Sequence, residues 1–127
     1  MLFKIRLELA RTKDHPDGAH DIGYEFAAPL TSEGRIDSAA WQKERGHCRV
    51  RRFRRGEADD VGHLMHRPGG GRGGSWAFHY DIASDGEDDE AGYRFADHVF
   101  RVGEYVSVRE DDELVTYHVT RVEPASH

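Results

Sequence analysis

The chain contains 9 histidines, so metal binding is the first chemistry that its side chains suggest. His79 and Asp81 are two positions apart, so their side chains share one face of a strand. If the glycine-rich segment before them closes a regular hairpin, His63 lies opposite His79 on that face. Imidazole and carboxylate groups together suit zinc. His63, His79 and Asp81 are therefore a candidate metal site, and the alternative is a pair of ordinary surface histidines on a hairpin.

A run of arginines offers a second chemistry, the binding of phosphates or other anions. Residues 45–55 read RGHCRVRRFRR, in which one aromatic residue stands among the cations. Oligonucleotide-binding barrels use this mixture, with cations for phosphates and an aromatic ring for base stacking. The arginines can instead protect a strand edge or pair with the acidic stretches 84–90 and 110–113, and the net charge of −6 favours this second interpretation. The candidate binding face comprises Arg49, Arg51, Arg52, Phe53, Arg54 and Arg55.

The glycine-rich segment contains a phosphate-binding pattern, since Gly69, Gly71 and Gly74 match G-x-G-x-x-G. In a dinucleotide-binding domain this pattern follows a strand and opens a helix, whose N-terminus binds the pyrophosphate. Here the residues that follow alternate aromatic with small or polar side chains, which indicates a strand instead. The glycines therefore predict the turn of a β-hairpin between VGHLMHR (61–67) and WAFHYDI (76–82).

Covalent catalysis would depend on Cys48, the only thiol of the chain. Its neighbour His47 points to the opposite face of a strand, which separates the two groups. Cys48 is in phase with Val50, so the pattern favours a small buried core residue. No two carboxylates stand out as an acid–base pair, and the acidic run 84–90 lacks the residue order of a calcium loop. The sequence therefore favours a protein that is not an enzyme and binds no cofactor.

Length and composition indicate one small domain. The chain has 127 residues, of which 37% are hydrophobic and 33% charged, enough for a modest core. A single cysteine excludes an internal disulfide bond. The first residues, MLFKIRLELAR, are unlike a signal peptide, and no window has the roughly 18 apolar residues of a membrane span. We expect a cytoplasmic protein with no membrane partner, a β-rich domain at 1–123 and a disordered tail at 124–127.

Hydrophobic periodicity predicts the strands of the first half of the chain. Residues 2–10 alternate apolar and polar side chains without a break and predict a half-buried strand. Residues 14–23 are rich in aspartate and glycine and predict a loop, which a second strand over 24–30 follows. A third strand is expected over 48–53. Its apolar phase slips by one residue before Phe53, as a bulge would produce.

One short helix is expected between the second and third strands. Asp37 or Ser38 has the side chain of an N-cap, and Gly46 supplies a stop signal. The helix therefore centres on Trp41 and has two to three turns. Its apolar side is expected to consist of Ile36, Ala40 and Trp41.

The residue pattern in the second half of the chain predicts strands and tight turns. Beyond the glycine hairpin, further strands are expected at 93–95 and 98–100, and a final hairpin joins 104–110 to 114–122. Strands that recur every 8–12 residues or so, with turn residues between them, are typical of an antiparallel barrel or sandwich. The fold class expected is therefore mainly β, with about 7–8 short strands and one short helix near Trp41.

The carboxy-terminal third carries the pattern H-x-F-x-x-G-E-Y-V-S, from His98 to Ser107, followed by a hairpin and a T-[YF]-x-V strand. On this pattern the chain resembles a family of small bacterial proteins that has no established activity. The similarity extends to APL (28–30), Trp41, CRVRRF (48–53) and WAFHYD (76–81). The resemblance implies a free-standing domain and assigns no substrate or catalytic residue.

Together these patterns predict a non-enzymatic binding or interaction module, whose partner is a protein or a small ligand that the sequence does not identify. Two alternatives remain open. The first is a binder of single-stranded nucleic acid or another polyanion through the arginine-rich strand 49–55. The second is a metal-binding protein that uses His63, His79 and Asp81.

Overall fold

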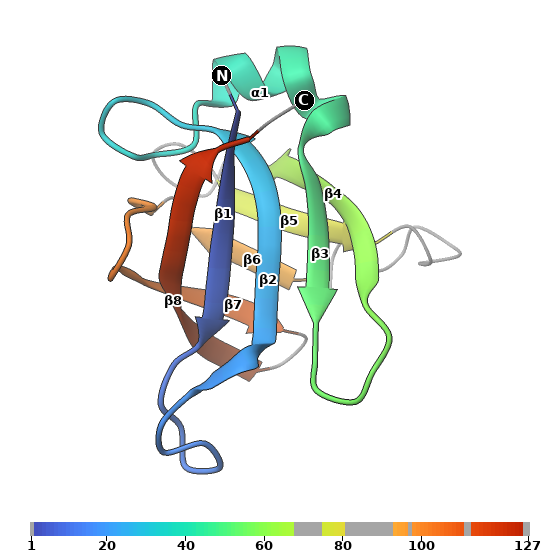
Figure 1. Ribbon diagram of the computed structural model, residues 1–127. Helices are drawn as coiled ribbons and strands as arrows, with labels where there is room; N and C mark the ends of the chain where they lie inside the picture. Colours follow the sequence, from blue (N-terminus) through green and yellow to red (C-terminus); the bar gives the residue numbers. More distant parts are fainter. Residues whose placement is uncertain (1, 68–74, 81–92, 97, 111–112, 126–127) are drawn as a thin grey trace.

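The computed structural model describes residues 2–67, 75–80, 93–96, 98–110 and 113–125. These residues form an antiparallel β-barrel with one short α-helix across one end (Figure 1). The strands are β1 (Leu2–Leu9), β2 (Ala19–Pro29), β3 (Arg49–Phe53), β4 (Asp60–Arg67), β5 (Ser75–Tyr80), β6 (Tyr93–Ala96), β7 (Tyr105–Glu110) and β8 (Glu113–Pro124). The helix α1 (Ser38–Glu44) continues into a 3-10 turn at Arg45–His47. The expected mainly β fold with one helix at Trp41 is confirmed.

The strand order decides between the two architectures that the sequence left open. Each strand pairs antiparallel with the next, and β8 returns to pair with β1, so the sheet curls on itself instead of stacking as a sandwich. Between β6 and β7 the described pairing is a single residue pair, Arg94 with Arg109. Closure of the other edges leaves few free strand groups for edge-to-edge aggregation. Among the described residues, the β6–β7 ladder is therefore the shortest of the barrel.

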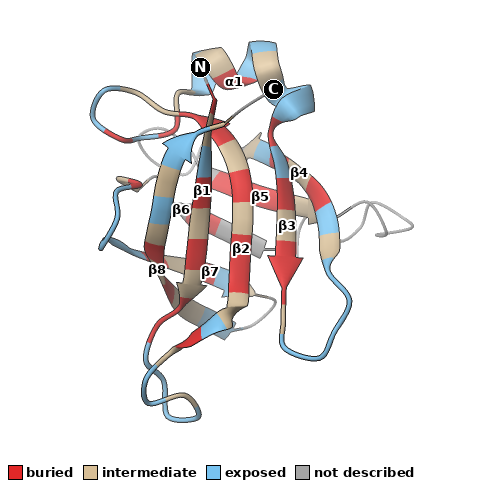
Figure 2. Ribbon diagram, in the orientation of Figure 1, coloured by how far each residue is buried: buried red, intermediate tan, exposed pale blue. Residues whose placement is uncertain are grey.

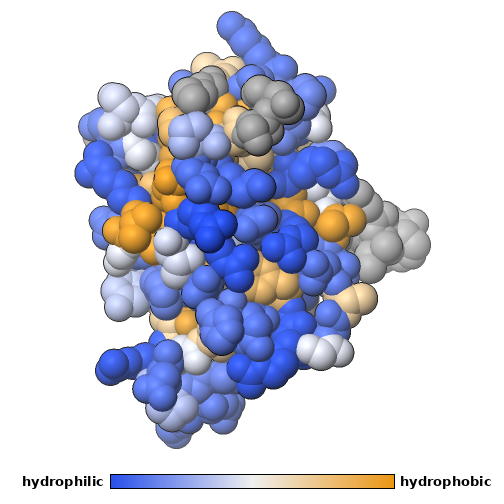
Figure 3. Space-filling view, in the orientation of Figure 1, coloured by the Kyte–Doolittle hydropathy of each residue, from blue (hydrophilic) through white to orange (hydrophobic). Residues whose placement is uncertain are grey.

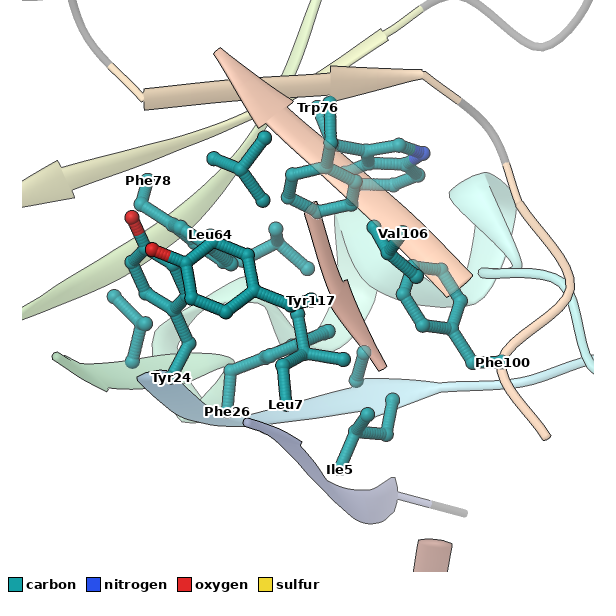
Figure 4. Close-up of a cluster of buried hydrophobic side chains, with 14 of the residues drawn as sticks. Ile5, Leu7, Tyr24, Phe26, Leu64, Trp76, Phe78, Phe100, Val106 and Tyr117 are labelled. Carbon is teal, nitrogen blue, oxygen red and sulfur yellow. The ribbon is translucent and has the colours of Figure 1, made fainter. Parts of the chain in front are cut away.

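Side chains alternate between the interior and the outer wall, as Figure 2 shows along β1, β2 and β3. On β1, Ile5 and Leu7 have no exposed surface. Aromatic rings fill much of the interior (Figure 4), with centroids of Tyr24 and Phe78 4.9 Å apart. Each such buried side chain stabilises the fold by about 1.5–3 kcal/mol. The alternation predicted for residues 2–10 is thus the alternation of a barrel wall.

The start of β2 differs from the sequence-based expectation, which placed residues 14–23 in a loop. The strand begins at Ala19, and its pairing with β1 shifts register, since Glu8 pairs with Gly23 but Leu9 with Ala19. A Cβ on Gly23 would lie 1.9 Å from the carbonyl oxygen of Leu7. Gly23 therefore permits a close approach of two backbones at a bulge, and sequence alone cannot distinguish this role from a turn.

The helix forms where capping chemistry predicted it. Asp37 has extended backbone angles, and its Oδ1 accepts a hydrogen bond of 3.1 Å from the amide of Ala40. Trp41 is 5% exposed and Ala40 is half-buried, while Ile36, just before the helix, is also buried. The helix covers the end of the barrel at which β1 starts and β8 ends (Figure 1). Asp37 is therefore the N-cap, and Trp41 anchors the helix to the core.

Replacing Asp37 by alanine is expected to lower the free energy of unfolding by about 1 kcal/mol, because the amide of Ala40 loses its acceptor. Urea denaturation monitored by tryptophan fluorescence measures this change. The matched control is Ser38→Ala, at the exposed first helical residue. We expect the control to stay within about 0.5 kcal/mol of the wild type, and equal losses in both variants would contradict the capping role.

Three further expectations differ from the structure. The register of β3 with β2 and β4 runs without a shift, so the slipped apolar phase before Phe53 is not a bulge. Residues 98–100 form no strand, although Phe100 is 1% exposed and belongs to the core. Pro124 pairs with Phe3, and the amide of Ala125 donates to Leu2 O, so order extends into the predicted tail.

Within the described ranges, no helix has the length and apolar character that a membrane crossing requires.

Candidate binding surface

The arginine-rich strand β3 divides its residues between the two sides of the barrel wall. Val50 and Arg52 pair with Phe26 and Tyr24 of β2, which lie in the core, so both point inward. The other three residues of the strand, Arg49, Arg51 and Phe53, alternate with these two and belong to the outer wall. The six residues of the predicted binding face therefore do not share one surface, because Arg52 lies inside the barrel.

Arg52 belongs to a buried polar cluster near the barrel end opposite α1. Its Nη2 lies 3.6 Å from Glu110 Oε1, and the two side chains are 8% and 10% exposed. The hydroxyl groups of Tyr24 and Tyr117 lie next to each other (Figure 4), and both donate to Glu110 Oε2. Arg54 Nη2 approaches Glu110 Oε1 from the outside at 3.5 Å. Two tyrosine hydroxyls thus donate hydrogen bonds to the Glu110 carboxylate, and two arginines balance its charge.

The electrostatics of this cluster favour a structural role. Burial, together with the adjacent Glu110 carboxylate, raises the pKa of Tyr117 above its ordinary value. Tyr117 therefore stays a neutral hydrogen-bond donor at physiological pH. A second carboxylate, Asp60, lies 3.8 Å from Arg52 Nη1. The arrangement neutralises a buried guanidinium and keeps the Tyr117 hydroxyl protonated beside it.

Phe53, the proposed stacking residue, is covered by cations. The guanidinium carbons of Arg6 and Arg51 lie 4.3 Å and 5.2 Å from its ring centroid, and the residue is 7% exposed. Arg51 also donates to Asp59 Oδ2 at 2.9 Å and to Glu25 Oε1 at 3.5 Å. A nucleic-acid base would have to displace these cation–π contacts before it could stack on the ring.

The remaining arginines also pair within the fold. Arg55 donates to both carboxylate oxygens of Asp21, at 2.6 Å and 3.0 Å. These contacts lower the pKa of Asp21. Of the two acidic stretches expected to neutralise the arginines, 110–113 contributes Glu110, whereas 84–90 lies outside the described residues. The other described carboxylates are Asp21 and Glu25 of β2, Asp59 of the segment before β4, and Asp60 at the start of β4.

Of the candidate metal ligands, two lie where the sequence predicted them. His63 of β4 pairs directly with His79 of β5, as expected for the glycine hairpin. His63 Nε2, however, lies 3.0 Å from Arg49 Nη1. This cation competes with a metal ion for the lone pair of the imidazole nitrogen. Asp81 lies outside the described residues, as do the hairpin glycines. Among the residues that are described, no three His, Cys, Asp or Glu side chains are grouped to hold a metal ion.

Cys48 is a core residue, as its phase indicated. It has no exposed surface, and its Sγ lies 3.5 Å from Glu44 O. Burial, with a smaller contribution from the Glu44 carboxylate, raises the pKa of the thiol to about 11. His47, its neighbour in the sequence, is exposed. A buried thiol that stays protonated is inert as a nucleophile.

A shallow groove on the outer wall of β1–β4 brings together charged and apolar side chains that the sequence places far apart. Its volume is about 270 Å³, and Figure 3 shows this face as mainly hydrophilic with small hydrophobic areas between the charged groups. The groove is lined by Lys4, Glu25, Phe26, Ala27, Arg49, Val50, Arg51 and Val61. Sequence reasoning found Arg49 and Arg51 but missed Lys4, Ala27 and Val61, because only the cross-strand register makes them neighbours.

Comparison with protein-family models, with curated proteins and with solved structures finds no match. The class of protein is therefore defined by the fold and the groove, without a known relative. It is a small antiparallel β-barrel domain with one capping helix and a mixed-charge groove on its wall.

Proposed function

We propose that this protein is a non-enzymatic binding module whose ligand surface is the groove on the outer wall of β1–β4. The observation that carries the proposal is the groove itself, which combines exposed cations with the apolar surfaces of Ala27 and Val61. Val61 is 43% exposed, so its apolar side chain is accessible to a ligand. A few polar groups around an apolar floor are typical of binding sites.

The arginine pairing argues against the polyanion alternative. Arg51, Arg52, Arg54 and Arg55 each lie within 4.0 Å of a carboxylate oxygen, so their charge is largely neutralised inside the fold. A polyanion gains affinity mainly from cations that release its counterions, and paired arginines contribute less to this effect. The proposal therefore rests on a local groove and does not require a broad basic surface.

A fragment screen by ¹H–¹⁵N correlation NMR tests the proposed surface. We expect anionic and amphipathic fragments to shift the amide signals of Lys4, Ala27 and Val61, because these residues line the groove. Val61→Glu adds an anion and fills the groove on an exposed position, so it is expected to abolish these shifts. Leu114→Glu, at a 60% exposed position of β8, is the matched control and leaves them unchanged.

Two results would contradict the proposal. Shifts confined to other surfaces, or equal binding by Val61→Glu and the wild type, would show that the groove is not the ligand surface. Stoichiometric zinc in the purified protein that is lost in His79→Ala would instead favour the metal-binding alternative.

A further inference from the structure

We infer that the groove binds an extended, acidic and partly aliphatic segment of a partner protein, an inference that rests on the proposed function and names its ligand class. Three features of the molecule support it: the register of β1–β4, the charges that line the groove and the space between these charges.

The register places a small residue between two cations. Lys4 of β1 pairs directly with Ala27 of β2, and Arg49 of β3 lines the same groove beside Ala27. Lys4 and Arg49 are both exposed. Because the Ala27 side chain is short, a carboxylate has room beside it, within reach of the Lys4 ammonium and of the Arg49 guanidinium, whose Nη1 also contacts His63 Nε2 at 3.0 Å.

The apolar part of the groove lies next to this cationic pair. Val61 of β4 pairs with Arg51 of β3, two residue pairs along from the pair formed by Arg49 and His63 and so on the same face of the sheet. Adjacent strands are about 4.8 Å apart, so the groove from β1 to β4 spans roughly 14 Å. An extended peptide advances about 3.3 Å per residue and crosses this distance with about four residues. Every second side chain of such a peptide faces the groove, so an acidic and an aliphatic residue two positions apart meet the cations and Val61 in turn.

The charges that line the groove favour a peptide over a nucleic acid. Glu25 lines the groove and pairs with Arg51 at 3.5 Å, and Asp59 pairs with the same arginine at 2.9 Å. These carboxylates repel a strand that carries a charge at every nucleotide, whereas a peptide offers uncharged positions beside them. The only aromatic residue among the lining residues, Phe26, is 1% exposed and gives no platform for base stacking.

The inference is tested with three probes of about six residues or nucleotides, a length that covers the groove. They are the peptide Glu-Ser-Val-Ser-Glu-Ser (the Glu-Val peptide), which presents Glu and Val on one face, the corresponding Lys-Val peptide with Lys in place of Glu, and oligothymidylate, each titrated into the ¹⁵N-labelled full chain. We expect the Glu-Val peptide alone to shift Ala27 and Val61, with affinity that falls as salt rises. Lys4→Ala and Arg49→Ala each weaken its binding by about two- to fivefold, as expected for exposed ion pairs. Lys13→Ala, an exposed cation outside the groove, is the matched control and leaves binding unchanged.

Each other outcome overturns the inference. Equal binding of the Lys-Val peptide, or unchanged affinity in both Lys4→Ala and Arg49→Ala, removes the role of the cations. Salt-sensitive binding of oligothymidylate that Arg49→Ala abolishes makes the partner a nucleic acid. If fragments shift the groove but the Glu-Val peptide does not, the acidic ligand class fails while the proposed function stands. If neither shifts it, both fail.

Discussion

Replacing Glu110 by alanine is expected to lower the free energy of unfolding by about 3–5 kcal/mol, the range measured when one partner of a buried ion pair is removed. The substitution leaves the guanidinium of Arg52, which is 8% exposed, without its closest buried counter-charge. It also leaves the hydroxyl groups of Tyr24 and Tyr117 without their acceptor. Urea denaturation at neutral pH, followed by circular dichroism, measures the change.

Glu113 provides the matched control, since it pairs with Glu110 across the β7–β8 hairpin but is exposed. We expect Glu113→Ala to change stability by less than about 0.5 kcal/mol. The double variant Arg52→Met with Glu110→Leu is expected to be more stable than Glu110→Ala, because no buried charge remains uncompensated. A Glu110→Ala variant as stable as Glu113→Ala would show that the buried cluster contributes little.

The second large effect is expected at Trp41, the residue that fixes α1 to the barrel. Trp41→Ala should lower the free energy of unfolding by about 3–5 kcal/mol, through the lost burial of the ring and the cavity that remains. The indole packs edge-on against Trp76, with centroids 5.7 Å apart, and its Nε1 donates to Leu64 O at 3.0 Å. Thermal and urea unfolding of the variant measure the loss.

Trp41→Phe separates the two contributions. The phenyl ring keeps most of the apolar contact but leaves Leu64 O without its donor, so we expect a loss smaller than that of Trp41→Ala. Gln42→Ala, at the next and exposed position of the helix, controls for changes in helix propensity and is expected to be nearly neutral. If Trp41→Ala were as mild as Gln42→Ala, the helix would not depend on this anchor.

Local patterns in the sequence were sufficient for much of the secondary structure. Unbroken alternation predicted β1, and Asp37 predicted the start of α1, because both signals depend on residues a few positions apart. The glycine hairpin even gave the correct pairing of His63 with His79, since a short connection restricts the register of two strands. The resemblance to a small bacterial family stays a prediction.

The candidate site was predicted only in part, and β3 shows why. The sequence-based prediction put Phe53 and all five arginines of 49–55 on one binding face, although residues that alternate along a strand take two faces. The structure has Phe53 on the outer wall under Arg6 and Arg51, while Arg52 lies inside beside Glu110. A buried arginine is favourable only where a carboxylate meets it, and that carboxylate comes from β7, far along the chain.

Sequence by itself therefore determined a small, mainly β chain, its helix and the residues that alternate on each strand. Tertiary structure alone decided that the sheet closes through β1 and β8, and that Lys4, Ala27 and Val61 meet Arg49 in one groove. The physical reason is that periodicity records which face a residue takes, whereas neighbours across strands depend on register. Register in turn depends on bulges, such as the one at Gly23, and on closure of the whole barrel.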